Sequence, residues 1–300
     1  MKILLTGATG YIGQSLLPVL LQQGHEVICC VRDKGRLDVT PFDPNRVKVI
    51  EVDFLNEKSL HSIPEDIEIA YYLMHSMSAE SGDFEKLEKG VAENFRNRIQ
   101  QTRTTQVIYL SGIVNNEELS KHLTSRKAVE DILSEASFNL TTLRAGIIVG
   151  SGSASFTIIR DLVQKLPVMV APIWLNTRSQ PISIRNVVQF LSGVIARPDT
   201  YKKSFDVGGP DILSYKDMLL QFAKVRKLKR RIFVIPVMTP KLSSYWLYFI
   251  TSTNYKLAVN LVHSMKVEVI CKENDLASRL GISLMTYEES VQAAFDKLGQ

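Results

Sequence analysis

Short apolar runs alternate with longer amphipathic stretches through the first half of the sequence. The runs have the length of buried strands, and the stretches between them repeat apolar residues every three or four positions, as helices do. The expected strands are a run that begins at Lys2 and ends before Gly7, then Glu26–Val31, Val47–Val52, Ile67–Leu73, Gln106–Leu110 and Leu140–Val149. The expected helices are one with apolar residues from Ile12 to Leu21, then roughly Asp83–Gln101 and Leu119–Ser137. This alternation predicts βαβ units and a parallel sheet with right-handed crossovers.

The pattern becomes less regular from about Ser151, where glycines and prolines separate shorter elements. The expected elements there are helices at Asn186–Ile195, Tyr215–Val225 and Leu242–Thr251, with strands at Phe205–Val207 and Arg231–Pro236. No internal repeat or low-complexity linker marks a boundary. We therefore expect a dinucleotide-binding core over residues 1–150 and a smaller C-terminal α/β lobe over residues 151–300, packed on the same sheet.

Three glycines spaced three apart follow the first strand. In a nucleotide-binding turn, the first glycine permits the tight turn, the second lets the backbone approach a pyrophosphate, and the third lets the helix pack closely. The N-terminus of the helix that follows offers N–H groups and a positive dipole end to phosphates. Position between a strand and a helix makes this a specific signal, and the alternative is a set of turn glycines without a ligand. The expected cofactor-binding residues are Gly7, Thr9, Gly10, Tyr11, Ile12 and Gly13.

The ends of the next strands supply further candidates for cofactor binding. Arg32 ends the second strand, where an acidic residue favours NAD and an arginine accommodates the 2′-phosphate of NADP. Asp33 opposes this interpretation, so the sequence favours NADP without excluding NAD. Asp53, after the third strand, either accepts from the adenine amino group or serves as a turn residue. His75 follows the fourth strand at the ligand-binding edge, and a loop histidine bonded to backbone is the alternative.

Composition and charge exclude several other classes of protein. The 300 residues are 45% hydrophobic and 22% charged, which is ordinary for a globular protein. A net charge of +5 suits anionic ligands but does not by itself predict nucleic-acid binding. The three cysteines lack metal-ligand spacing, so we expect reduced packing residues and no metal site. Since the first strand begins at residue 2 and no stretch is long enough to span a bilayer, a cytoplasmic location is expected.

Two patches in the second half have alternative interpretations. Lys224–Arg231 concentrates six basic residues, and a solvated helix end is favoured over binding to nucleic acid or a membrane surface. The aromatic residues of Leu242–Thr251 favour core packing, with a substrate pocket, a homo-oligomer contact or peripheral membrane contact as alternatives.

Several of these motifs resemble those of a known superfamily. The turn Thr6–Gly13, Val52-Asp53-Phe54 and Tyr109-Leu110-Ser111-Gly112 are similar to the extended and atypical short-chain dehydrogenase/reductases. Within them, the sequence resembles the NmrA-like, NAD(P)H-binding branch often labelled nucleoside-diphosphate-sugar epimerases, over nearly the whole chain. The resemblance implies a doubly wound Rossmann sheet, a nicotinamide cofactor and a small-molecule substrate.

The catalytic pattern of that superfamily is altered here. The family has a serine after the fifth strand, which Ser111 matches, and a Tyr-x-x-x-Lys on the next helix, where the Lys is commonly followed four residues on by Glu. Alignment on Glu130 puts His122 at the Tyr position and Arg126 at the Lys position. One helical turn separates the two, and a histidine can relay a proton near neutral pH. The alternative is a surface histidine with an Arg126–Glu130 ion pair.

Three functional hypotheses follow. The first is an NADP-dependent oxidoreductase or isomerase that acts on a small carbonyl-type substrate, with Ser111, His122 and Arg126 as catalytic residues. The second is a non-catalytic NADP-binding redox sensor or assembly protein, which the altered catalytic pattern favours. A nucleotide-sugar epimerase is a weaker third, since those enzymes need the tyrosine.

Overall fold

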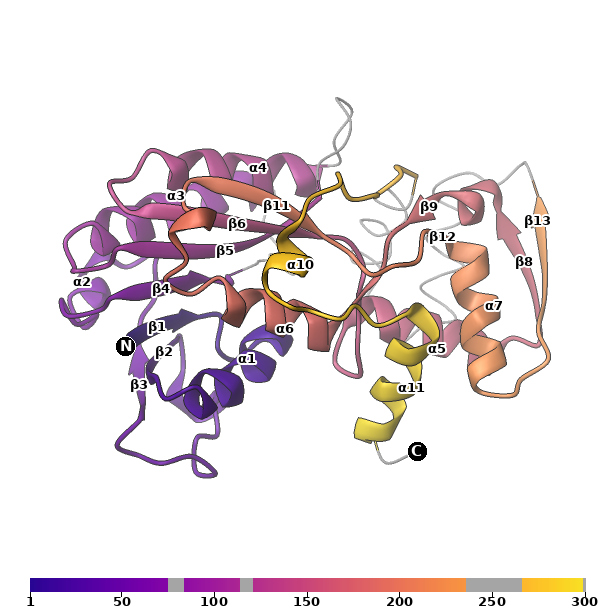
Figure 1. Ribbon diagram of the computed structural model, residues 1–300, viewed down its shortest axis with the longest axis horizontal. Coiled ribbons are helices and arrows are strands. Elements are labelled where there is room, and N and C mark those ends of the chain that lie inside the picture. Colours follow the sequence, from indigo (N-terminus) through magenta and orange to yellow (C-terminus); the bar gives the residue numbers. More distant parts are fainter. Residues whose placement is uncertain (75–83, 114–120, 236–265, 299–300) are drawn as a thin grey trace. The chain divides into compact units, whose positions relative to one another are not determined.

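The computed structural model describes residues 1–74, 84–113, 121–235 and 266–298 (Figure 1). Contacts within the chain divide it into two compact units. The first comprises Met1–Gly112, Leu123–Arg144 and Val188–Phe205, and the second comprises Ile113–His122, Ala145–Val187 and Asp206–Gln300. The expected division into residues 1–150 and 151–300 stays a prediction.

A seven-stranded sheet has the order β11-β6-β5-β4-β1-β2-β3. Its strands are β1 (Lys2–Thr6), β2 (Glu26–Val31), β3 (Val47–Glu51), β4 (Ile69–Tyr72), β5 (Gln106–Gly112), β6 (Asn139–Ala145) and β11 (Lys203–Val207). The pairings of β1 with β2, β2 with β3, β1 with β4 and β4 with β5 are all parallel. The direction in which the strands are added reverses between β1 and β4. The expected α/β fold with a doubly wound sheet is therefore confirmed.

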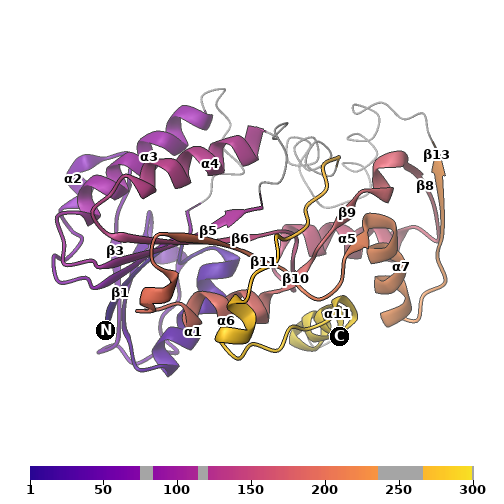
Figure 2. The same ribbon diagram turned by 45° about the horizontal axis from the view of Figure 1, so that its top comes forward.

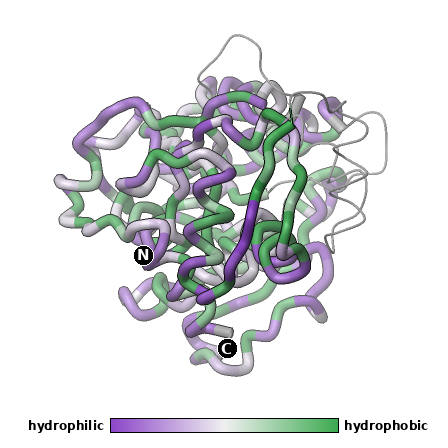
Figure 3. Tube along the Cα trace, turned by 90° about the vertical axis from the view of Figure 1, so that its right-hand side faces the viewer, coloured by the Kyte–Doolittle hydropathy of each residue, from purple (hydrophilic) through white to green (hydrophobic). Residues whose placement is uncertain are grey.

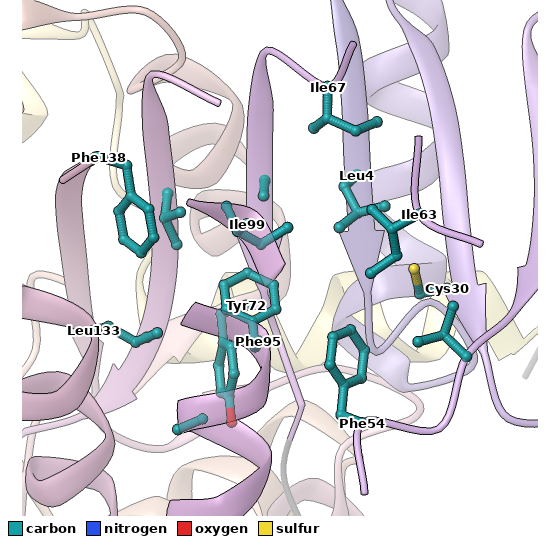
Figure 4. Packing of buried hydrophobic residues seen from close by; sticks show 14 of the residues in the cluster. Leu4, Cys30, Phe54, Ile63, Ile67, Tyr72, Phe95, Ile99, Leu133 and Phe138 are labelled. Carbon is teal, nitrogen blue, oxygen red and sulfur yellow. The ribbon is translucent and has the colours of Figure 1, made fainter. Parts of the chain in front are cut away.

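Helices cover both faces of this sheet (Figures 1 and 2). On one face lie α2 (Glu57–Leu60), α3 (Phe84–Ile99) and α4 (Lys121–Ser134), and on the other α1 (Tyr11–Gln22) and the end of α6 (Ile184–Gly193). The core beneath α3 and α4 is built on aromatic rings (Figure 4). The ring centroid of Tyr72 lies 4.9 Å from that of Phe95 and 5.5 Å from that of Tyr109, both edge-on. Such edge-to-face pairs fix the helices and strands that carry the candidate site.

One strand prediction needs correction. The run Leu140–Val149 forms two strands, because β6 ends at Ala145 and β7 (Ile148–Val149) pairs instead with β10 (Ile182–Ser183). The chain bends at Gly146, where a Cβ would lie 3.1 Å from the Gln180 carbonyl oxygen. An apolar run alone cannot reveal such a change of partner, because both strands are buried.

The second unit has its own core, formed by α5 (Ala154–Lys165), α7 (Tyr215–Val225) and α11 (Tyr287–Leu298). The rings of Phe156, Phe222 and Phe295, one from each helix, lie 5.5–5.6 Å apart. Two strand pairs complete the second unit, β8 (Val168–Pro172) with β13 (Arg231–Ile235) and β9 (Arg178–Ser179) with β12 (Leu213–Ser214). The remaining short helices belong to both units and are α10 (Leu276–Arg279), η1 (Lys34–Arg36), η2 (Ile173–Asn176) and η3 (Pro198–Thr200).

The cysteines pack as expected. All three thiols are free, and Cys29 and Cys30 are buried in β2. Burial raises the pKa of the Cys29 thiol to about 12. Within the described ranges, no group of three or more acidic, histidine or cysteine side chains is arranged to hold a metal ion. None of the described helices is long and apolar enough to cross a membrane.

Candidate cofactor and catalytic site

The glycine turn begins at the point where the strand order reverses. Gly7 has a φ of +67°, and a Cβ there would lie 2.5 Å from the carbonyl oxygen of Leu73, just after β4. Both the backbone conformation and the lack of space require glycine. The Thr6 hydroxyl donates to the Tyr71 carbonyl (2.7 Å) and accepts from the Leu73 N–H (3.1 Å), which joins the ends of β1 and β4. Open α/β sheets bind ligands outside the carboxyl ends of strands at such a point.

The other two glycines differ in what they permit. A Cβ at Gly13 would lie 2.4 Å from the Gly7 carbonyl oxygen, so this glycine lets α1 pack against the turn itself. Gly10 is exposed, and its nearest neighbour would be 3.2 Å from a Cβ. Gly10 is the N-cap of α1 and provides no side chain to bond the first turn, which also lacks acidic residues. The start of α1 therefore presents main-chain N–H groups and a positive dipole end without a carboxylate.

The remaining residues of the turn contribute main-chain positions. The Thr9 carbonyl accepts from the Gln14 side-chain amide at 3.2 Å. Tyr11 and Ile12 are the first two residues of α1 and are half-buried. The Tyr11 carbonyl accepts from the Ser15 hydroxyl at 2.8 Å, which closes the first turn. The sequence-predicted turn residues thus run from the end of β1 into the first turn of α1.

A free guanidinium stands at the end of β2. Arg32 is exposed and has neither an ion pair nor a hydrogen bond among the residues that the structure describes. The neighbouring Asp33 carboxylate accepts from the Gly35 N–H at 2.9 Å and thereby caps η1. The Lys34 N–H is bonded to the Glu51 carboxylate at 3.2 Å. The acidic residue that opposed an NADP assignment is therefore engaged locally, and the arginine is not.

Asp53 has a role within the loop after β3. Its carboxylate accepts from the Leu55 N–H at 3.0 Å, and its main-chain carbonyl accepts from Asn56 N–H at 2.8 Å. The turn interaction is thus present. Because that bond uses one of two carboxylate oxygens, the contact with adenine stays a prediction.

Ser111, which the sequence predicted, lies inside the first unit beside Tyr109, whose role the sequence did not predict. Tyr109 and Ser111 are two residues apart on β5 and point to the same face, toward α4. The Tyr109 hydroxyl donates to the Arg126 carbonyl at 3.2 Å, and burial raises the pKa of this phenol to about 12 against the opposing effect of the Arg126 cation. Ser111 is 1% exposed, and its Oγ makes no hydrogen bond of ordinary geometry within the described part of the chain. Its hydroxyl is near enough to that of Tyr109 to oppose the rise in the pKa of the phenol.

Helix α4 carries the altered catalytic pair. Arg126 is half-buried, and the backbone of His122 lies one turn before it; the His122 side chain is outside the description. The alternative Arg126–Glu130 ion pair is wrong, because Glu130 is bound by the Arg144 guanidinium at 2.7 and 3.1 Å. The Ser204 hydroxyl donates to the same carboxylate at 2.6 Å. Arg126 therefore keeps an unpaired cation within the described residues.

Besides its bond to Tyr109 on β5, α4 is also held to α3. The Ser125 hydroxyl donates to the Glu88 carboxylate, and both residues are buried. Lys127 lies on another side of the helix, where it forms an exposed ion pair with Asp131 at 3.3 Å. Two expected features, His75 and the aromatic stretch Leu242–Thr251, fall outside the described residues.

A family model described as NAD(P)H-binding matches residues 7–162 of the chain. The matched range begins at Gly7 and includes Tyr109 and Ser111 on β5 and Arg126 on α4. No curated protein matches the chain.

Solved structures share the fold over almost the full length. An NADP(H) complex of a triphenylmethane reductase from Citrobacter sp. aligns with a TM-score of 0.78 at 16% identity, covering 97% of this chain and 99% of that one. A nucleoside-diphosphate-sugar epimerase from Staphylococcus aureus gives 0.77 at 15% identity, covering 97% and 100%. An NADPH-dependent quinone oxidoreductase from Escherichia coli gives 0.74 at 16% identity, covering 98% and 99%. The fold and the matched sequence model agree with the expected likeness to atypical short-chain dehydrogenase/reductases, and the chain belongs to the NAD(P)H-binding family.

Proposed function

We propose that the chain binds NADPH across the carboxyl edge of its first-unit sheet. The observation that carries this proposal is the pairing of a glycine turn at the strand-order reversal with a free guanidinium at the end of β2. The pyrophosphate would lie over Gly7–Gly13, where Gly10 leaves the start of α1 uncapped. Arg32 would hold the 2′-phosphate with charge-assisted hydrogen bonds. Lys34 and Arg36, both exposed, add positive charge beside it.

We further propose that the chain is an oxidoreductase or isomerase for a small carbonyl-type substrate. Bound NADPH supplies hydride chemistry, and the protein supplies position and protons. Ser111 is the residue that would hydrogen-bond a substrate carbonyl oxygen, since its hydroxyl is buried and makes no hydrogen bond of ordinary geometry within the described residues. The Arg126 cation would stabilise negative charge that develops on this oxygen. His122 would transfer the proton.

Tyr109 is a positioning residue in this scheme. Its phenol is protonated at neutral pH at its ordinary pKa near 10, and burial raises that pKa further, to about 12. The O–H donates a hydrogen bond to the Arg126 carbonyl. This bond joins β5 to α4 next to the two residues with proposed roles. Two structural neighbours in complex with NADPH or NADP(H) are named as a quinone oxidoreductase and a triphenylmethane reductase, which supports an oxidoreductase.

A second function is favoured by the catalytic helix itself. The chain has histidine and arginine where the resembled enzymes have tyrosine and lysine, and an arginine cannot exchange a proton at working pH. A protein with this change would bind the cofactor without turnover and act as an NADP redox sensor or an assembly protein. The NmrA-like branch, a cytoplasmic location and a homo-oligomeric state also stay predictions.

One experiment separates the two functions. NADPH binding to pure protein is first measured by fluorescence, and NADPH absorbance is then followed with a panel of quinones, aldehydes and ketones. Oxidation that depends on one of these substrates and is lost in Ser111→Ala supports the enzyme. Tight NADPH binding with no oxidation across the panel supports the sensor, and absence of NADPH binding refutes both.

A further inference from the structure

The ribbon of β8 and β13 has an apolar outer face. The parallel register places Phe233 beside Val170 and Arg231 beside Val168. Phe233, Val168 and Val170 are 56%, 52% and 47% exposed, whereas Met169 between the two valines is buried in the core of the second unit. Figure 3 faces this ribbon and shows its strands as mostly hydrophobic, with a hydrophilic start to β13. Because side chains alternate along a strand, the ribbon is apolar on both faces and only the inner face is packed.

A groove adjoins this outer face, between α7 and the start of β13. Its volume is about 500 Å³. Aliphatic side chains from three segments line it, including Val168, Leu220 and Leu228, together with the cations Lys229 and Arg231. Val168 therefore belongs both to the exposed face and to the groove, so the two form one continuous surface.

The positive charge of this surface is largely uncompensated. Among the six basic residues of Lys224–Arg231, Lys224 is paired with the Glu288 carboxylate at 2.7 Å. Arg230 donates to main-chain carbonyls, which carry no net charge. Lys229 and Arg231 are exposed and form no ion pair with any described carboxylate. A surface that is both apolar and cationic results, named here the ribbon surface: Val168, Val170, Lys229, Arg231 and Phe233.

We propose that the ribbon surface binds the headgroup region of an anionic phospholipid bilayer. Phe233 and the two valines would enter the boundary between headgroups and acyl chains, where apolar side chains gain free energy by leaving water. Lys229 and Arg231 would bind lipid phosphates, since anionic membranes attract cations near their surface. Nucleic acid also attracts cations, but it offers no apolar phase to exposed valines. This inference does not depend on the proposed reaction.

The test measures co-sedimentation of the full chain with vesicles. Binding is expected to vesicles of phosphatidylcholine with one third phosphatidylglycerol, to weaken with salt, and to be slight on pure phosphatidylcholine. Each removed cation should weaken partitioning about fivefold, so Lys229→Gln with Arg231→Gln should cost roughly 30-fold. Phe233→Ser should cost roughly tenfold. All three positions are exposed, so the variants should keep the fold.

Matched changes on the first unit serve as controls. Leu55→Ser removes an equally exposed apolar side chain, and Lys48→Gln with Lys58→Gln removes two exposed cations. These should bind vesicles as the unaltered chain does. Equal losses in the control and ribbon variants, binding that none of them changes, or binding to RNA but not to vesicles would overturn the proposal. A Phe233→Trp variant adds an independent readout, compared with the unaltered chain because that chain already has Trp174 and Trp246. If the ribbon enters the bilayer, brominated lipids should quench the fluorescence of the variant more strongly, and equal quenching of the two contradicts the proposal.

Discussion

Arg32 provides the sharpest test of cofactor choice, because removing its side chain should not disturb the fold. Arg32 is exposed and unpaired among the described residues, and the Asp33 carboxylate beside it is already engaged by the Gly35 N–H. Arg32→Ala therefore breaks no observed interaction. Surface changes of this kind alter the free energy of unfolding by less than about 0.5 kcal/mol. Any larger effect on binding must come from the ligand.

The size of the effect follows from the 2′-phosphate. A hydrogen bond to a charged group contributes about 1.5–3 kcal/mol, which corresponds to a change in Kd of about 10- to 150-fold. NADPH affinity should fall by that factor in Arg32→Ala. NADH lacks the phosphate, so its affinity should change less than about twofold.

The assay is a fluorescence titration of both cofactors, with thermal unfolding measured on the same samples. Arg103→Ala is the matched control, since it removes an exposed arginine that precedes β5 at the opposite edge of the sheet. This control should leave both affinities unchanged. Equal losses for NADPH and NADH in Arg32→Ala would mean that the arginine contacts the adenosine and not the 2′-phosphate. An unchanged NADPH affinity would remove the basis for assigning NADP.

Three other predictions concern the glycine turn, the catalytic helix and the thiols. Gly13→Ala should lower the free energy of unfolding by about 1–3 kcal/mol, because the new Cβ would meet main-chain atoms at 2.4 and 2.8 Å. Gly10→Ala should instead leave the melting temperature unchanged and lower the affinity for NADPH. If His122 transfers the proton, His122→Ala should reduce turnover by about 10²- to 10⁴-fold and flatten its pH profile near neutrality while NADPH binding persists; unaltered turnover would exclude it. At pH 8 Cys29 and Cys30 should resist a thiol reagent in the folded chain, since both are buried and burial raises the pKa of Cys29 to about 12. All three thiols should react once the chain is unfolded. The stability gained from a neutral Cys29 should be complete below the ordinary thiol pKa of about 8.5 and decline as pH rises toward 12.

Local pattern was sufficient for several helices and strands in both units. The predicted bounds of β2 and α7 agree with the structure, and those of α3 and α4 differ by one to three residues. These segments combine clear apolar periodicity with well-marked ends, such as the Ser214–Asp217 capping box of α7. The need for glycine at Gly7 also follows locally, since its φ is positive.

Contacts between distant residues could not be predicted in the same way. The spacing of Arg126 and Glu130 predicted a pair along α4, but Arg144 on β6 and Ser204 on β11 bind that carboxylate instead. A bidentate arginine on a neighbouring strand satisfies the carboxylate better than a flexible pair on one helix. The role of Tyr109 was missed for a related reason, since its partner is a main-chain carbonyl on α4. Alternation along β5, which puts Tyr109 on the face of Ser111, was the available signal.

Because Arg126 does not pair with Glu130, His122 and Arg126 can be considered as one pair on α4. In the resembled enzymes, a lysine lowers the pKa of a tyrosine that ordinarily titrates near 10. An imidazole ordinarily titrates near 6.5, so a histidine in that position needs no such assistance. The residue one turn on is then required only to carry a positive charge, and an arginine does so at every working pH. Because Glu130 is bound by Arg144, the charge of Arg126 is left for a ligand. The histidine at 122 and the arginine at 126 are therefore chemically compatible with each other, and if the pair is catalytic, reduction should accelerate at lower pH, where the imidazole gains its proton.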